Sequence, residues 1–331
     1  MGHLWRVLCE RAGTAGSMVT ALGVAAGLIA VATACGSSGG VRVNLDERAD
    51  LPTVQATGES GAFSPSSNPL RIAITGLLSP TETLSGYGGF LTYLEQRLGR
   101  PVKLVQRGSY AELNALIQAR QVDMALVCPL PYVQGQRTFG MELVAAVVSQ
   151  GAAAHYSYLV VAADSDITSL GQLRGKTFAF SDPNSHSGWL APAYQLALQG
   201  EAPDTFFARH VFTYHHSESL RAVANRLVDG AAVDSLIYDY LTVTDPELMG
   251  RTRVIARWGP YPSPPFVVHP DLDPAVKERL RRILLTMGQD PQGQQVLGNL
   301  HMEGFAAVAD GAYELIRSME DRVRAPTSVS R

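Results

Sequence analysis

From residue 70 onward, short apolar strand patterns alternate with helical patterns, and this alternation limits the possible folds more than any other feature of the chain. Leu70–Ile74 reads as the first strand, and apolar residues then recur at helical spacing over 87–98 until Gly99. Further strand patterns follow at 102–105, 122–127, 143–148 and 158–162. Strands separated by helices predict a mainly parallel sheet in an α/β fold.

A second alternating set begins with the strand Thr177–Phe180 and continues through a helix at 189–198 and a helix that we expect Ser217 to cap. The pattern at 254–258 should lead back to the first set, and 266–269 should rejoin its sheet. We therefore expect two α/β lobes. The expected divisions are 70–163 for lobe 1, 164–257 for lobe 2, 258–322 for the return to lobe 1 and 323–331 for a tail.

The amino terminus has the features of an export signal. Basic residues among the first eleven precede an uncharged, mostly apolar run at 18–34. The segment Val-Ala-Thr-Ala-Cys at 31–35 resembles the lipobox of bacterial lipoproteins, which implies cleavage of 1–34 and a lipid anchor at Cys35 on the outer face of the cell membrane. Plain secretion and an uncleaved anchor remain alternatives. Gly, Ser, Pro and Asp enrich 35–69, which predicts a flexible tether.

Composition excludes several classes of protein. The chain has 331 residues, 27 basic and 30 acidic side chains and a net charge of −3, so we expect no nucleic-acid partner. Its three cysteines are too few for a disulfide scaffold or a four-cysteine zinc site. We expect a monomer without metal or cofactor.

The segment Ser-Asp-Pro-Asn-Ser-His-Ser-Gly at 181–188 joins a strand to a helix. The first turn of a helix has unpaired amides and a partial positive charge, so such a loop attracts anions. Ser185, His186 and Ser187 add side-chain donors that suit a tetrahedral oxyanion such as phosphate, phosphonate, phosphite or sulfonate. The alternative is that these polar residues only cap the helix.

This loop and a second block at 214–225, Tyr-His-His-Ser-Glu-Ser-Leu-Arg-Ala-Val-Ala-Asn, resemble two blocks of the phosphonate and phosphite binding proteins of ABC importers. Weaker likenesses lie at 122–127 and 305–316. The resemblance spans about 70–320 in the right order. It implies a type II periplasmic binding fold, with two α/β lobes, two hinge crossings, a ligand between the lobes and no catalysis.

The resemblance also assigns ligand-binding roles. It places Ser185, His186 and Ser187 on the anion loop of the family. The remaining candidates are His216 in the second block, Tyr110 at the start of a helix in lobe 1, Tyr156 or its neighbour His155 as a further aromatic, and Asp234 near an acidic or amide position.

Two departures from the family pattern bear on specificity. His186 stands where the family usually has threonine, and the returning segment 259–266 lacks the aspartate that phosphonate binders carry there. Both changes favour more negative ligands. We expect His186, together with His216, to be protonated in the complex; the alternative is that His186 only packs beside Trp189.

We therefore expect a lipid-anchored solute-binding protein that closes over a small oxyanion and passes it to an ABC permease. Two alternatives remain. One is a receptor of the same fold that reports its ligand to a sensor kinase. The other is an enzyme acting on a phosphorylated or sulfonated small molecule, for which the sequence shows no paired nucleophile and base.

Overall fold

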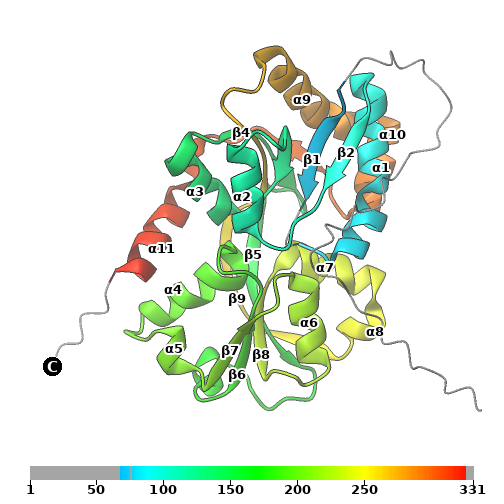
Figure 1. Cartoon of the computed structure of the whole chain (residues 1–331). Helices are drawn as coiled ribbons and strands as arrows, with labels where there is room; N and C mark the ends of the chain where they lie inside the picture. Colours follow the sequence, from blue (N-terminus) through cyan, green and yellow to red (C-terminus); the bar gives the residue numbers. More distant parts are fainter. Residues whose placement is uncertain (1–67, 75–76, 326–331) are drawn as a thin grey trace, which may run out of the picture. The chain divides into compact units, whose positions relative to one another are not determined.

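The computed structural model describes residues 68–74 and 77–325, which fall within one compact unit. The predicted signal peptide, Cys35 and tether lie outside the described residues. The described chain builds two sheets, each flanked by helices (Figure 1). We call the six-stranded sheet with its helices the first lobe and the five-stranded sheet with its helices the second lobe.

The first lobe contains a sheet with the strand order β11-β4-β10-β3-β1-β2. Its strands are β1 (Leu70–Ile74), β2 (Val102–Val105), β3 (Met124–Leu126), β4 (Glu142–Val148), β10 (Pro265–Val268) and β11 (Gly304–Ala306). Its helices are α1 (Pro80–Leu98), α2 (Tyr110–Gln118), α3 (Pro129–Phe139), α9 (Pro274–Thr286), α10 (Pro291–Asn299) and α11 (Glu314–Arg324).

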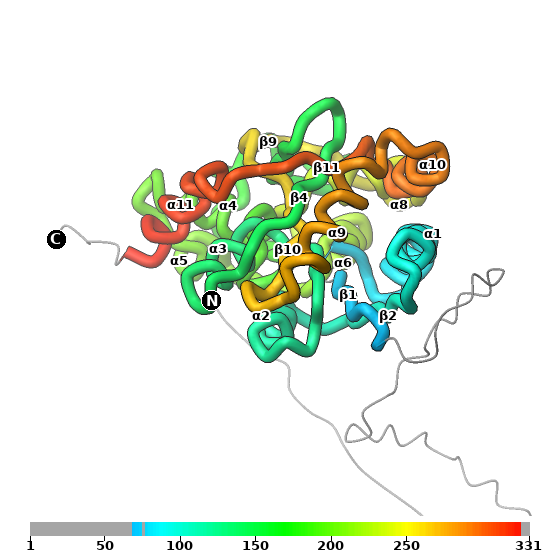
Figure 2. The backbone as a smooth tube through the Cα atoms, turned by 90° about the horizontal axis from the view of Figure 1, so that it is seen from above, coloured from blue at the N-terminus to red at the C-terminus, as the bar shows by residue number. Residues whose placement is uncertain are grey.

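Strand β1 shows why these residues form a buried strand. β1 pairs in parallel with β2 and β3. Ile72 and Ile74 pack with the core of α1, whereas Ala73 packs with the core of α2 and α3. Seen from above, α1 and α10 lie on one side of the sheet and α2 and α3 on the other (Figure 2). A sheet covered on both faces requires apolar residues at successive positions, which explains the three consecutive apolar residues at 72–74.

The second lobe contains a sheet with the order β7-β6-β8-β5-β9. Its strands are β5 (Ala154–Ala162), β6 (Thr177–Phe180), β7 (Arg209–Phe212), β8 (Gly230–Asp234) and β9 (Thr252–Pro262). Its helices are α4 (Ala191–Ala197), α5 (Pro203–Phe206), α6 (His216–Ala224), α7 (Ser235–Thr244) and α8 (Pro246–Met249).

The prediction from the sequence placed one strand in the wrong sheet. The expected first-lobe pattern at 158–162 lies in β5, which pairs with β8 and β9 in the second sheet. The apolar pattern shows that β5 is buried but does not show its partners. The chain therefore first crosses between the sheets before Ala154, and it returns between β9 and β10. Strand β10 then pairs with β3 and β4 of the first sheet, as expected for 266–269.

Two helix starts also differ from the prediction. The helix expected over 189–198 begins with a π-helical turn, η2 (His186–Leu190), that runs directly into α4. His215, not Ser217, is the N-cap residue of α6, and the Ser217 hydroxyl donates to Glu82 in the first lobe. In the described part of the chain no helix is long and apolar enough to cross a membrane.

Candidate functional site

The loop after β6 places three predicted residues at the start of η2. Ser185 is the N-cap residue, and its Oγ accepts a hydrogen bond from the Gly188 amide at 3.0 Å. Gly188 is required here, because a Cβ at this position would lie 1.9 Å from Ser181 Oγ. The side chains of Ser185, His186 and Ser187 are fully buried. Ser185 therefore caps the helix, as the alternative interpretation expected. A capping role does not prevent the same residue from binding a ligand.

The amide of His186 points across to the first lobe. It donates a hydrogen bond to Cys128 Sγ at 3.1 Å, and the same sulfur lies 3.9 Å from Ser185 Oγ. Burial raises the pKa of Cys128 to about 12, so the thiol remains protonated at neutral pH. A first-lobe side chain therefore contacts the start of η2. Cys128 was not among the predicted site residues, because its position at a strand end is typical of an ordinary buried apolar residue.

His216 comes from the first turn of α6 and presents a defined tautomer. Its Nδ1 accepts a hydrogen bond from the Asp234 amide at 3.0 Å, so the proton lies on Nε2. Nε2 lies 3.4 Å from Ser185 Oγ and 3.5 Å from Ser181 Oγ. Burial lowers the pKa of His216 to about 4. His216 is therefore a neutral donor at neutral pH.

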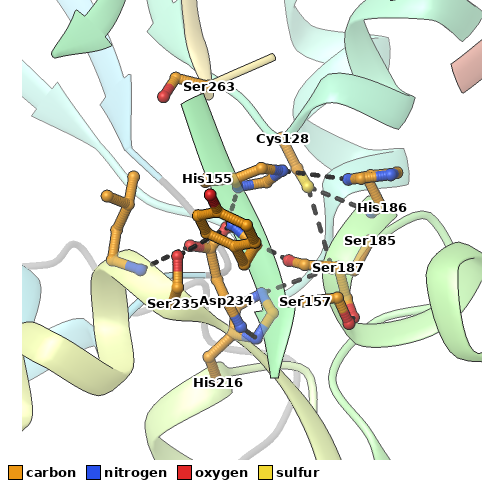
Figure 3. Close-up of polar contacts among 12 residues, drawn as sticks. Cys128, His155, Ser157, Ser185, His186, Ser187, His216, Asp234, Ser235 and Ser263 are labelled. Carbon is orange, nitrogen blue, oxygen red and sulfur yellow. Dashed lines mark hydrogen bonds and ion pairs between the residues drawn. The ribbon is translucent and has the colours of Figure 1, made fainter. Parts of the chain in front are cut away.

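His155 lies between Asp234 and His186 (Figure 3). Its Nδ1 is 2.7 Å from Asp234 Oδ2, and its Nε2 is 3.1 Å from His186 Nδ1. The two imidazole rings are stacked, with 5.3 Å between their centroids. Alternation along β5 sends the next side chain, that of Tyr156, to the other face, where it is 36% exposed. Of the two candidate aromatics, only His155 joins the buried cluster.

Asp234 carries the negative charge of the cluster. Besides His155, its carboxylate accepts hydrogen bonds from the Leu236 amide at 2.9 Å and from Ser187 Oγ at 3.2 Å. Burial alone would raise the pKa of Asp234, but the charge and hydrogen bond of His155 overcome that effect and hold it at about 2. Asp234 is therefore ionised and already receives three donors from the protein.

Burial and the neighbouring His155 lower the pKa of His186 well below its usual value, so that the imidazole is neutral in this structure. Its protonation in a complex stays a prediction. His186 does not only pack, since its Nδ1 lies 3.1 Å from His155 Nε2, and its ring lies edge-on against Tyr261 with 4.4 Å between the centroids. Trp189 packs against Phe180 and Phe212.

Tyr110 approaches the cluster from the first lobe. Its amide donates to Asp182 Oδ2 of the second lobe at 3.1 Å. Its hydroxyl is fully buried and has no hydrogen-bond partner among the described residues; the same holds for His186 Nε2 and Ser263 Oγ. Burial raises the pKa of Tyr110 well above its usual value, so the hydroxyl keeps its proton. Buried polar groups are normally paired, so these atoms indicate a missing partner.

Ser157 belongs to the cluster and Ser263 is a further buried serine, and neither was among the predicted site residues. Ser157 Oγ donates to the carbonyl of Ser187 at 2.6 Å. The sequence could have predicted this residue, because Ser157 stands two residues after His155 and therefore lies on the same face of β5. Ser263 lies in the crossing between β9 and β10, a position that no local pattern reveals.

Two α/β lobes joined by two crossings, with a buried polar cluster between them, define a type II periplasmic binding protein. A family model described as ABC transporter, phosphonate, periplasmic substrate-binding protein matches residues 72–313. The chain belongs to this family, as the sequence resemblance predicted.

Individual relatives agree with this assignment. The phosphonates-binding periplasmic protein of Escherichia coli is 30% identical over 226 residues, which are 67% of each chain. The phosphate-import protein PhnD of Mycolicibacterium smegmatis is 29% identical over 209 residues, 60% of this chain and 65% of that protein. A binding protein component of an ABC phosphonate transporter from Pseudomonas aeruginosa superposes with a TM-score of 0.75 at 27% identity, covering 80% of this chain and 90% of its own.

Proposed function

We propose that the protein binds a small phosphonate, phosphite or phosphate-like oxyanion between its lobes and delivers it to an ABC permease. One observation carries this proposal: a buried cluster presents proton donors from both lobes, and the Tyr110 hydroxyl has no acceptor among the described residues. The neutral His216 Nε2–H and the Ser185 hydroxyl, which lie 3.4 Å apart, add donors from the second lobe. A deprotonated oxyanion supplies the acceptors that such a site lacks.

The charge of the cluster supports a fully deprotonated ligand oxygen. A free carboxylate would repel an anion or accept a hydrogen bond from a protonated ligand oxygen. Asp234 is instead paired with His155 and receives the Leu236 amide and the Ser187 hydroxyl. The carboxylate oxygens of Asp234 are therefore already occupied by protein donors, and the remaining donors are left for the ligand.

Contacts between the lobes link binding to closure. The Tyr110 amide bonds to Asp182, and Glu82 of α1 accepts a hydrogen bond from Ser217 of α6 and forms an ion pair with Arg221. A ligand held by both lobes adds to these contacts, so binding favours the closed arrangement.

The geometry of the histidines supports binding without catalysis. An Asp–His pair is part of a hydrolase triad, but His155 Nε2 faces His186 Nδ1 and not a hydroxyl group. His216 Nε2 does face the Ser185 hydroxyl, yet its proton is on that nitrogen because Nδ1 accepts the Asp234 amide. His216 is therefore unsuited to act as a general base toward Ser185.

A thermal-shift panel tests the ligand class. Phosphate, phosphite, alkylphosphonates, sulfonates and sulfate are added separately to the purified protein. A ligand at 100 times its Kd stabilises the folded state by about 2.7 kcal/mol, which corresponds to a rise in Tm of about 5–10 °C. We expect a rise with phosphorus oxyanions; a rise with none of these anions would contradict the proposal.

We also propose that Cys35 carries a lipid anchor and that the mature protein acts as a monomer outside the cell membrane. Cys35→Ala should release the protein from the membrane fraction into the medium or periplasm and abolish incorporation of labelled fatty acid. Analytical ultracentrifugation tests the monomer.

Deletion of the gene separates an importer from a sensor. Cells that lack an importer should lose oxyanion uptake, whereas cells that lack a sensor would lose the cellular response to the ligand and retain uptake.

A further inference from the structure

Cys128 lies where the first lobe meets the anion loop, residues 181–188. It is the N-cap residue of α3, but its side chain makes no capping hydrogen bond to that helix. Its sulfur instead accepts a hydrogen bond from the His186 amide at 3.1 Å and lies 3.9 Å from Ser185 Oγ (Figure 3). Both contacts cross from one lobe to the other, so the thiol is turned toward the second lobe.

The groups that contact this sulfur are of the kind that binds an oxyanion. Burial raises the pKa of Cys128, and the charge of Asp234 adds to the rise. Three hydrogen-bond donors lower the pKa in opposition: the amides of His186 and Ser187 and the side chain of Ser185. Hydrogen bonds lower the pKa of an acid when they stabilise its ionised form. The donors of the anion loop are therefore directed at the Cys128 sulfur.

A further buried donor lies beside the thiol. The Tyr110 hydroxyl has no partner among the described residues. After burial, the neighbouring Cys128 is the largest cause of the raised pKa of Tyr110, which indicates that the two side chains lie close together. Since Tyr110 belongs to α2, the thiol stands among donors of both lobes.

The thiol is a weak partner for these donors. Sulfur is a poor hydrogen-bond acceptor, and this thiol is neutral because its pKa is about 12. It still serves the buried His186 amide better than no acceptor would, because an unpaired buried amide costs free energy. A deprotonated ligand oxygen makes charge-assisted hydrogen bonds that are about twice as strong as neutral ones. An oxyanion should therefore win these donors from the thiol.

We propose that Cys128 is an internal competitor of the ligand: its thiol occupies donors of the anion loop in the empty closed protein and is displaced when an oxyanion binds. The inference rests on the proposed oxyanion site and adds an autoinhibitory contact to it. The contact lets the lobes close without a ligand, because it gives the His186 amide an acceptor. It weakens the binding of every oxyanion by the same factor, because the empty protein is the same in each case.

Calorimetric titration of phosphate and methylphosphonate into the natural protein and Cys128→Ala tests the competition. The variant lacks the sulfur, so the donors are free before the ligand arrives. Because one neutral hydrogen bond is lost from the empty form alone, we expect about fivefold tighter binding of both ligands. Val122→Ala is the matched control, since Val122 is buried in the same core next to the opposite end of β3; it should leave both affinities unchanged.

Cys128→Ser separates the acceptor from the volume of the side chain. A hydroxyl group is a stronger acceptor than a thiol, so it should compete at least as well. This variant should therefore bind no more tightly than the natural protein. Tighter binding by both Cys128→Ser and Cys128→Ala would assign the effect to side-chain volume and overturn the competition.

Amide NMR spectra of the natural protein and Cys128→Ala show whether the thiol is displaced. The substitution should shift the His186 amide resonance in the ligand-free protein, where sulfur is its acceptor. It should leave this resonance almost unchanged in the methylphosphonate complex, where a ligand oxygen has replaced the sulfur. An equal shift in both states would show that the sulfur stays in place and would overturn the displacement.

The outcomes separate this inference from the proposed function. Equal or weaker binding by Cys128→Ala than by the natural protein would overturn the internal competitor and leave the oxyanion site in place. Binding of neither anion by either protein would overturn both.

Discussion

His155 Nδ1 lies 2.7 Å from Asp234 Oδ2, and both side chains are fully buried. This contact keeps Asp234 ionised inside the protein. It also uses one carboxylate oxygen, Oδ2, as the partner of His155. The polarity of the whole cluster, which is rich in donors, depends on this pair.

The Asp234 pair predicts a loss of stability in acid. The pKa of Asp234 is lowered to about 2 in the folded protein, against about 3.9 when unfolded, so ionised Asp234 stabilises the fold by about 2–3 kcal/mol above pH 5. This stability falls as the pH drops toward 2, and about 1 kcal/mol should be gone at pH 3. Urea unfolding at pH 7 and pH 3 should show a smaller loss for Asp234→Asn than for the natural protein. An equal loss would contradict the assigned ionisation.

His216 predicts a second acid-sensitive step at higher pH. Burial lowers its pKa to about 4 from about 6.5, so the unfolded chain binds the proton more tightly and the fold loses stability as the pH falls through this range. Between pH 7 and pH 5 the loss should be about 2 kcal/mol in urea unfolding. His216→Gln should lack this part of the loss. If His216→Gln lost as much unfolding free energy between pH 7 and pH 5 as the natural protein, the loss would arise from other titrating groups.

Gly188→Ala should disrupt the anion loop. The new Cβ would lie 1.9 Å from Ser181 Oγ and 3.0 Å from His216 Cε1, so the loop or His216 must move. We expect a loss of about 2 kcal/mol or more in unfolding free energy and weaker oxyanion binding. Gly298→Ala in α10 is the control, since no atom lies within 4 Å of its added Cβ. Unchanged ligand affinity in Gly188→Ala would remove the loop from the binding site.

Glu82→Gln should weaken the closed arrangement. Glu82 is part of α1 in the first lobe, and it contacts Ser217 and Arg221 of α6 in the second lobe. Because the pair is only partly buried, we expect about 1 kcal/mol, which is about a fivefold loss of ligand affinity. Arg226→Gln is the control, as Arg226 pairs with Asp164 within the second lobe. Equal affinity of the two variants in calorimetry would exclude Glu82 from closure.

The fold was predictable to the extent that periodicity determines it. The apolar run at β1 and the helical spacing of α1 identify their elements because both are buried against one core. The same kind of pattern at β5 did not reveal which sheet it joins, since pairing depends on residues far away along the chain. The strand patterns alone therefore could not place the first crossing.

The grouping of the candidate residues was predictable where a local motif contains them. Ser185, His186, Ser187 and His216 lie in blocks that resemble the family, and the structure brings all four together. The state of the histidines was not predictable, because their protonation depends on burial and on contacts such as that between His155 and His186. Cys128 was missed because its contact with η2 crosses from one lobe to the other.

The most direct test of the oxyanion site is calorimetric titration of the natural protein and of Tyr110→Phe with methylphosphonate. The buried Tyr110 hydroxyl should donate to the ligand, so its removal should weaken binding by about 10- to 100-fold. Tyr132→Phe, which removes a hydroxyl bonded to Asp310 instead, should bind with unchanged affinity. Absence of binding by the natural protein, or equal affinity in Tyr110→Phe, would contradict the account.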